Sequence, residues 1–346
     1  MRVVRAGLIV AGTAATLALA ACSGTPIGDQ GYEVKLGYFP NLTHAPAIIA
    51  IEHGMIEDAL AEAGARLTTQ TFNSGSDTIK ALLGGGLDAT YIGPSPAVTA
   101  FVQSNGEGVR VVSGATAGGA ALVVQPEIEG LDDLVGLKVA TPGLGNTQDI
   151  ALRSYLAGHG YATDPDGGGD IAVVPQNNGT TVQTFRSGEI AGAWVPEPYL
   201  SLLVESGGKV LVDEADLWPG GQFVTTQLIV RTEFLQQHPA LVRAIVHGNV
   251  DAIRYIEDNP EAARDEVAAE LAELTGASID PAVTVSAWAR LAFTVDPLSA
   301  SLVKGAQDAA ALGLLNGDIS GIGRLYDLGT LNAILGEEGL PTVTVE

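Results

Sequence analysis

Basic residues are scarce in this chain of 346 residues, which has 17 Lys and Arg against 40 Asp and Glu and a formal net charge of −23. Binding to nucleic acid needs clustered cations that neutralise phosphates, so we expect no nucleic-acid partner. Aromatic residues are also few, at 5%, although 46% of the chain is hydrophobic. A core of this composition is packed mainly by small aliphatic side chains, and the length suits two domains.

Cysteine is nearly absent, because Cys22 is the only one, and no intramolecular disulfide can form. It ends the sequence L-A-A-C, after two basic residues and an apolar run over 6–20. This order is typical of an export signal, and L-A-A-C resembles a bacterial lipobox, whose cysteine is lipidated. We therefore predict a signal peptide over 1–21 and a lipidated tether over 22–31, with plain secretion as the alternative. The predicted location is the outer face of the cytoplasmic membrane, in the cell envelope or periplasm.

Strong catalytic motifs are missing as well. The sequence G-P-S-P-A around Ser95 lacks the final Gly of a nucleophile elbow and has Pro on both sides of the Ser. Gly143 and Gly145 are followed by Gln148 in place of the third Gly of a dinucleotide site, and there is no P-loop or H-E-x-x-H. The acidic stretch 164–170 lacks the bidentate Glu of a calcium loop. We predict no catalytic residue, no cofactor and no metal site, and keep a secreted α/β hydrolase as a distant alternative.

Polar turns between strands and helices are what the chain has in quantity. In L-G-Y-F-P-N-L-T-H-A-P-A-I-I-A-I, over 36–51, an alternating strand runs into a Pro-Asn turn, and Thr43 can cap the helix that follows. Similar junctions occur around 73–76, 93–96 and 143–147, and weaker ones around 177–181 and 194–199. In the third junction we expect Ser95 to be the N-cap and Pro96 the first helical residue. Such turns line one shared crevice in an open parallel sheet, which favours ligand binding.

Two interruptions divide the βα pattern. A Gly-rich crossing at 114–119 suits a hinge between lobes, and L-W-P-G-G at 217–221 is a plausible second crossing. We predict a discontinuous first lobe, 32–116 and 219–346, and a second lobe, 117–218. The part after 232 has mostly helical spacing, including helices over 261–274, 280–292, 297–315 and 325–335, and it ends in a strand or tail.

The ordered set of motifs F-P-N-L-T-H, F-N-S-G-S-D, Y-I-G-P-S-P-A, P-G-L-G-N-T-Q-D and W-V-P-E-P-Y resembles the solute-binding proteins of nitrate, taurine and alkanesulfonate ABC importers. The resemblance covers nearly all of the mature chain. It implies an α/β, two-lobed periplasmic-binding-protein type II fold, with a two-strand hinge and the helical C-terminal part on the first lobe. It also implies a monomer that closes on a small solute, with a membrane permease and an ATPase on separate chains.

The resemblance carries the family's ligand loops onto twelve positions of this sequence. They are Asn41, Leu42, Thr43, His44, Ser74, Gly93 and Ser95 in the first lobe, and Asn146, Thr147, Gln148, Trp194 and Glu197 in the second. These loops contain no Lys or Arg, and the nearest cation is Arg153. Hydroxyls, amides and helix N-termini can hold an oxyanion without a cation. Glu197 could hold the ammonium of a zwitterion such as taurine. The alternative solute is a pyrimidine, an aromatic or another nutrient held by Trp194 and Glu197.

Overall fold

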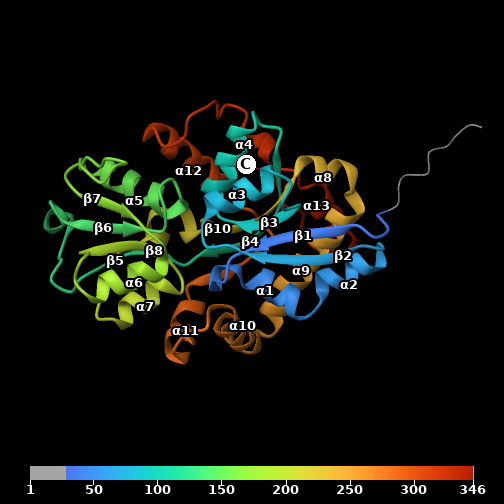
Figure 1. The fold of residues 1–346 in the computed structure, drawn as a ribbon, viewed down its shortest axis with the longest axis horizontal. Helices are drawn as coiled ribbons and strands as arrows, with labels where there is room; N and C mark the ends of the chain where they lie inside the picture. Colours follow the sequence, from blue (N-terminus) through green and yellow to red (C-terminus); the bar gives the residue numbers. More distant parts are fainter. Residues whose placement is uncertain (1–28, 346) are drawn as a thin grey trace, which may run out of the picture.

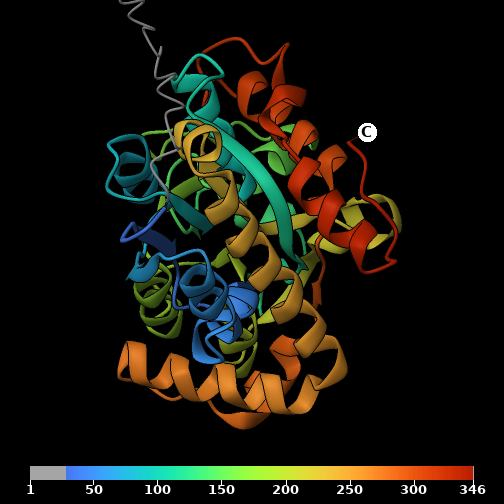
Figure 2. The same ribbon diagram turned by 90° about the vertical axis from the view of Figure 1, so that its right-hand side faces the viewer.

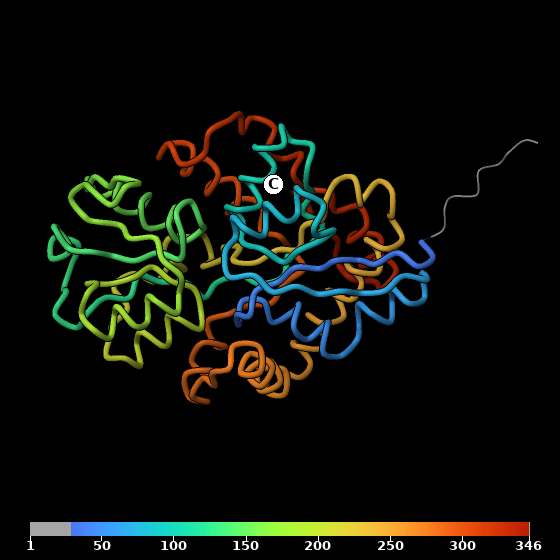
Figure 3. Tube along the Cα trace, in the orientation of Figure 1, coloured from blue at the N-terminus to red at the C-terminus, as the bar shows by residue number. Residues whose placement is uncertain are grey.

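The computed structural model describes residues 29–345, so the predicted signal peptide and Cys22 lie outside the described residues. These residues form two α/β lobes, each built on its own sheet (Figure 1). The trace in Figure 3 shows the second lobe, green to yellow, as a separate half of the molecule. The predicted α/β, two-lobed fold class is confirmed.

The first lobe contains a six-stranded sheet of order β11-β4-β10-β3-β1-β2. Its strands are β1 (Glu33–Tyr38), β2 (Arg66–Thr71), β3 (Ala89–Ile92), β4 (Val109–Gly118), β10 (Val224–Arg231) and β11 (Leu291–Phe293). β1 is parallel to β2 and β3, whereas β10 runs antiparallel between β3 and β4. The mixed order brings a returning strand into the middle of the sheet.

Helices cover both faces of this sheet, and Figure 2 shows the long helix α9 running across the lobe with α10 at its end. The helices of the first lobe are η1 (Leu42–His44), α1 (Ala45–Glu52), α2 (Met55–Glu62), α3 (Gly75–Leu83), α4 (Pro94–Gln103), α8 (Thr232–Gln237), α9 (Pro239–Asp258), α10 (Pro260–Thr275), α11 (Pro281–Trp288), α12 (Ser299–Ala311), η5 (Ile322–Leu325) and α13 (Gly329–Glu337). Along β10, Leu228 and Val230 face one core and Ile229 faces the other, as the two-residue period of a strand requires.

The second lobe contains a five-stranded sheet of order β7-β6-β8-β5-β9. Its elements are β5 (Ala120–Val124), η2 (Leu131–Leu134), β6 (Lys138–Thr141), α5 (Thr147–Gly158), β7 (Ala172–Pro175), α6 (Asn178–Arg186), β8 (Gly192–Pro196), α7 (Tyr199–Glu205) and β9 (Lys209–Asp213). The chain enters this lobe between β4 and β5 and returns through η3 (Glu214–Leu217) and η4 (Pro219–Gly221) to β10. Two further hydrophobic clusters fill its two faces.

The C-terminal part differs from the sequence prediction at one helix. The helix expected over 280–292 ends at Trp288, and Leu291–Phe293 forms β11, which pairs antiparallel with β4. The apolar spacing was compatible with either state, and pairing to the edge of the sheet decides the outcome. The last described residues, 340–345, form no regular element, although the amide of Val343 donates to Asn332 Oδ1 at 2.8 Å.

Candidate ligand-binding site

A small cleft of about 70 Å³ lies between the two lobes, at the carboxyl ends of the parallel strands. Ten of its lining residues come from the first lobe: Phe39, Asn41, Thr43, His44, Asn73, Gly75, Gly93, Pro96, Thr225 and Thr226. The other six come from the second lobe: Pro142, Asn146, Thr147, Gln148, Asn178 and Pro196. The cleft is therefore closed by residues from both halves of the molecule.

Four helices begin at the cleft. Helices α3 and α4 start there in the first lobe, and α5 and α6 start there in the second. The first amides of a helix have no intrahelical acceptor, and the helix dipole makes this end partially positive. Their convergence supplies hydrogen-bond donors that suit an oxyanion without any cationic side chain.

The lining of the cleft is polar but carries no formal charge. Among the described residues that line it there is no Lys, Arg, Asp or Glu, and the polar side chains are hydroxyls, carboxamides and the imidazole of His44. Its only titratable side chain, His44, is buried, and burial lowers the pKa of this imidazole to about 3. His44 is therefore neutral at pH 7.

The hydrogen bond made by His44 assigns its tautomer. The amide of Phe39 donates to His44 Nδ1 at 3.3 Å, and the two rings stack with centroids 4.7 Å apart. Because Nδ1 is an acceptor, the proton of the neutral ring is on Nε2. His44, which lines the cleft, therefore has its N–H donor at Nε2.

The lobes approach each other closely at the helix starts. A Cβ atom placed on Gly93 would lie 2.9 Å from Thr147 Oγ1, and one on Gly75 would lie 3.2 Å from Asn146 Oδ1. Helix α4 also contacts α5 across the lobe boundary. Both glycines therefore permit the close approach by having no side chain.

The structure brings seven of the twelve predicted site residues into the cleft. These are Asn41, Thr43, His44, Gly93, Asn146, Thr147 and Gln148. Leu42 is fully buried in the core, and Ser74 Oγ lies 2.8 Å from Ser76 Oγ. Ser95 lines an adjacent cavity of about 40 Å³, which Thr147 also lines.

Trp194 does not line the cleft, because its side chain is fully buried in the core of the second lobe. Its indole N–H donates to Glu214 Oε2 at 2.7 Å. Burial raises the pKa of the Glu214 carboxyl to about 7, although hydrogen bonds from Trp194 and Trp218 oppose the shift. The indole therefore satisfies a buried carboxyl group and offers no stacking wall to a solute.

Glu197 is also fully buried and does not line the cleft. Its carboxylate accepts hydrogen bonds from the amide of Ser201 at 3.1 Å and from Ser201 Oγ at 2.8 Å. Burial raises the pKa of Glu197 to about 7, while the bonds from Ser201 and the nearby Arg290 lower it. The carboxylate therefore caps the start of α7.

Two expected helix caps are corrected by the structure. Helix α4 begins at Pro94 with Gly93 as its N-cap, so Ser95 and Pro96 are its second and third residues. At the first junction Asn41 is the cap, because its side chain accepts the amide of Thr43 at 3.3 Å. In both places the helix begins earlier than predicted, because Pro94 and a 3₁₀ turn take up the first positions.

The sequence did not point to several lining residues. Asn73 and Gly75 flank Ser74, the residue that was predicted at their junction. Asn178 lies at a junction for which no site residue was predicted, and Thr225 and Thr226 lie on β10. The two threonines at the start of β10 point to the cleft only once β10 is known to pass between β3 and β4. Arg153 pairs with Asp149 at 3.1 Å, is 1% exposed and lies outside the cleft lining.

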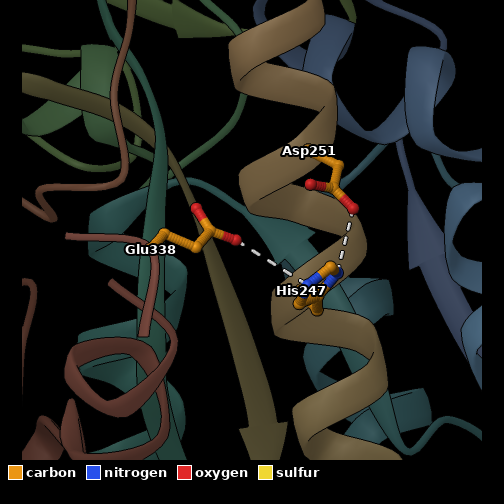
Figure 4. A group of neighbouring side chains, drawn as sticks. All are labelled: His247, Asp251 and Glu338. Carbon is orange, nitrogen blue, oxygen red and sulfur yellow. Dashed lines mark ion pairs between the residues drawn. The ribbon is translucent and has the colours of Figure 1, made fainter. Parts of the chain in front are cut away.

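The histidine–carboxylate group of His247, Asp251 and Glu338 is an ion-pair network joining α9 to the end of α13 (Figure 4). His247 Nδ1 faces Asp251 at 2.9 Å, and Nε2 faces Glu338 at 3.7 Å. The two carboxylates thus approach opposite ring nitrogens, and Arg254 is also paired with Glu338. One ligand atom from each residue lies within 4.8 Å of the other two, but each carboxylate pairs with a different ring nitrogen, and these pairs account for the cluster without a metal ion.

Within residues 29–345 no helix combines the length and the apolar character needed to cross a bilayer.

Comparisons with known proteins agree with this architecture. The chain is 28% identical to the taurine-binding periplasmic protein of Escherichia coli (strain K12) over 217 residues, which cover 62% of this chain and 66% of that relative. The match therefore spans just under two thirds of the relative's length. The putative aliphatic sulfonates-binding protein of Bacillus subtilis (strain 168) is 27% identical over 67% of this chain and 68% of its own.

The fold is also that of a solved binding protein. The alkanesulfonate-binding protein SsuA from Xanthomonas axonopodis pv. citri, bound to MOPS, superposes with a TM-score of 0.67 and 19% identity, covering 83% of this chain and 95% of its own. The likeness shows the two-lobed periplasmic-binding-protein type II fold. The chain matches the NMT1-like family over residues 29–272, and the relatives are binding proteins, so the prediction of a binding protein instead of an enzyme is confirmed. Because that match covers well over half of its length, the protein belongs to the NMT1-like family.

Proposed function

We propose that this protein is the extracytoplasmic solute-binding lipoprotein of an ABC importer, and that it captures a small oxyanion or zwitterion of the alkanesulfonate, taurine or nitrate class. The solute would bind between the lobes, and the closed form would be presented to a permease and an ATPase on separate chains. The convergence of four helix starts from both lobes on one uncharged polar cleft is the observation that carries this proposal.

The chemistry of the cleft supports a weakly basic anion. A sulfonate or nitrate keeps its charge at neutral pH and accepts several hydrogen bonds, which backbone amides, hydroxyls and carboxamides can supply. Because no carboxylate lines the cleft among the described residues, nothing there repels the anion. A volume of about 70 Å³ favours a solute of a few heavy atoms.

Two relatives support the same class, since they are a taurine-binding periplasmic protein and a putative aliphatic sulfonates-binding protein. The alternative of a pyrimidine loses the two residues proposed to hold it, because Trp194 and Glu197 both lie outside the cleft lining. Because Glu197 lies outside the lining, it is not available to pair with the ammonium of a zwitterion. That ammonium would have to donate its hydrogen bonds to the neutral oxygens of the cleft.

A ligand screen tests the proposed class. Taurine, methanesulfonate, nitrate, bicarbonate and a pyrimidine are compared by thermal shift and then by titration calorimetry. A true solute at 100 times its dissociation constant adds about 2.7 kcal/mol to the free energy of unfolding. Stabilisation by the pyrimidine alone, or by none of these compounds, contradicts the proposal.

Thr147→Val supplies the site-specific arm of the same test. It removes a hydroxyl from the cleft while keeping the side-chain shape, and we expect about tenfold weaker binding with an unchanged melting temperature. The exposed Thr71, on β2, provides the matched Thr→Val control. Equal affinities of the two variants would show that Thr147 does not contact the solute.

The lipid anchor is tested on the full chain in a bacterial host. Replacement of Cys22 by Ala should move the protein from the membrane fraction to the soluble exported fraction, because the only thiol available for acylation is lost. An unchanged membrane fraction in this variant would contradict lipidation at Cys22.

A further inference from the structure

A second hollow lies on the other side of the hinge from the ligand cleft. Starting from the edge near this hollow, the strand order is β11-β4-β10-β3-β1-β2 in the first lobe and β9-β5-β8-β6-β7 in the second. The chain passes directly from β4 into β5. The cleft lies at the ends of β1, β3, β6 and β8. The hollow, which we call the hinge groove, lies at the opposite edge, by β11 and β9.

Both lobes line the hinge groove, whose volume is about 490 Å³. Asp213 and Ala215 come from the second lobe and the connection after it, and Arg290, Ala292 and Asp296 come from the first. Gly118 and Gly119, where the chain crosses between the lobes, also line it. A neighbouring hollow of about 550 Å³ shares Gln222, Asp296 and Leu298 with it.

The crossing between the cleft and the hinge groove is suited to act as a pivot. Gly118 and Gly119 both have positive φ, +76° and +71°, which glycine adopts without strain. If the lobes rotate about this crossing so that the cleft opens, the surfaces beyond the pivot must approach each other. Opening the cleft therefore requires the hinge groove to narrow.

The side chain of Arg290 spans the hinge groove between the two lobes. Its Nη1 donates to Asp213 Oδ2 at 3.0 Å, and its Nε lies 3.6 Å from Glu197 Oε1, and both carboxylates belong to the second lobe. The main chain beside it also touches the pivot, since a Cβ atom on Gly118 would lie 2.8 Å from the Arg290 carbonyl oxygen. The guanidinium is already at contact distance, so the groove cannot narrow unless this side chain moves out.

We propose that Arg290 is a strut that holds the hinge groove open, so that side-chain bulk in this groove sets the balance between open and closed lobes. The strut is a positioning residue, because it acts on the solute only through lobe closure. This role of Arg290 depends on the two-lobed arrangement and not on the identity of the solute. Since apparent affinity scales with the closed fraction, the strut would also strengthen solute binding without contact.

Two variants of opposite expected sign test the strut in the full chain. Arg290→Ala removes bulk from the groove and should increase the fraction of open molecules three- to tenfold. Ala292→Trp adds bulk at an exposed lining position and should decrease that fraction by a similar factor. Arg290→Lys keeps length and charge but loses the two-sided contact, so it should fall between Arg290→Ala and the parent protein.

The readout is the distance between spin labels on Lys80→Cys, in α3, and Gln183→Cys, in α6, in a Cys22→Ser background. Both label positions are exposed, and the two helices begin on opposite sides of the cleft. Pulsed electron resonance gives the open and closed fractions without any solute, so the strut can fail while the proposed function stands. Taurine is then added as the probe for changes in affinity.

Matched controls separate bulk in the groove from general effects. Ala61→Trp adds the same side chain at an exposed position on α2, and Arg243→Ala removes an exposed ion pair to Glu337 inside the first lobe. Neither should change the label distances. Unchanged distances in Arg290→Ala and Ala292→Trp, or shifts opposite to those stated, would overturn the proposal.

Discussion

At the scale of single residues, His44 shows how burial sets the chemistry of the cleft. It is 3% exposed, and the amide of Phe39 donates to its Nδ1. An imidazolium at this position would lose its hydration and would lose that hydrogen bond, because both ring nitrogens would become donors. The fold therefore keeps the ring neutral, and solute binding should not depend on its protonation near pH 7.

The same burial predicts a pH dependence of stability. The folded-state pKa of His44 is about 3, below the ordinary value of 6.5, so the unfolded chain binds a proton that the folded chain does not. This group's contribution to stability is complete above pH 6.5 and is lost as the pH falls towards 3. At pH 4 the loss is about 3 kcal/mol.

His44→Asn should abolish that part of the acid destabilisation while keeping an acceptor for the Phe39 amide. Urea unfolding at pH 7 and pH 4 measures it, as the change in the free energy of unfolding between the two pH values. His159→Asn, at an exposed position, is the control. An equal pH dependence in the His44 variant and the parent protein would contradict a buried, neutral imidazole.

Residue identity alone could not decide which aromatic and acidic side chains face the solute. The sequence W-V-P-E-P contains both Trp194 and Glu197, but their directions depend on which face of β8 is covered by which helix and on the turn into α7. The polar turn residues were easier to place, because a junction at the end of a parallel strand points to the crevice whatever covers the sheet. Seven of the twelve predicted positions line the cleft for that reason.

At the scale of elements, the start of α4 limits how far the lobes can close. Gly93 is the N-cap and has φ −68° and ψ 159°, a conformation open to any residue, so Ala should not strain the backbone. Its added methyl group, however, would lie 2.9 Å from Thr147 Oγ1 on the facing helix α5. Glycine is therefore needed at position 93 because a side chain would clash with α5 when the lobes are closed, and not because of its backbone conformation.

We expect Gly93→Ala to weaken binding of the solute found in the screen by about tenfold or more, since overpacking costs about 1–3 kcal/mol. The melting temperature without solute should change little. The double variant Gly93→Ala/Thr147→Ala removes the clashing oxygen and should bind more tightly than the sum of the two single effects implies. Strict additivity of the two losses would show that these residues do not meet when the solute is bound.

The elements that the sequence misplaced are those fixed by contacts distant in the chain. Leu291–Phe293 becomes a strand because β4 offers an unpaired edge, and Thr225 and Thr226 reach the cleft because β10 enters the sheet from the opposite direction. The passages of the chain between the two sheets, in contrast, contain local signals, since the Gly-rich segment at Gly118 and Gly119 and the Pro-Gly segment of η4 lie there. Connections between the lobes are rich in Gly and Pro and can be recognised from the sequence, whereas the pairing of distant strands has no such local signal.

At the scale of the whole molecule, each lobe has hydrophobic clusters of its own. They meet at α5 of the second lobe, where Ile150 packs into a cluster that otherwise belongs to the first lobe. The connections between lobes include two crossings, the contacts of α4 and α12 with α5 and of α11 with α7, and the Arg290 ion pairs. Domains with their own cores can unfold as separate cooperative units when the interface between them is small.

Calorimetry should therefore show two overlapping transitions for the protein alone, with a van't Hoff enthalpy well below the calorimetric one. A solute held by residues of both lobes binds only when both are folded, so saturation should raise the lower transition more and merge the two. Thr147→Val should reduce the merging at a fixed solute concentration, because it weakens binding without touching either core. A single transition with equal enthalpies at zero solute would contradict this prediction, because it would mean that the contacts between the lobes already couple their unfolding without solute.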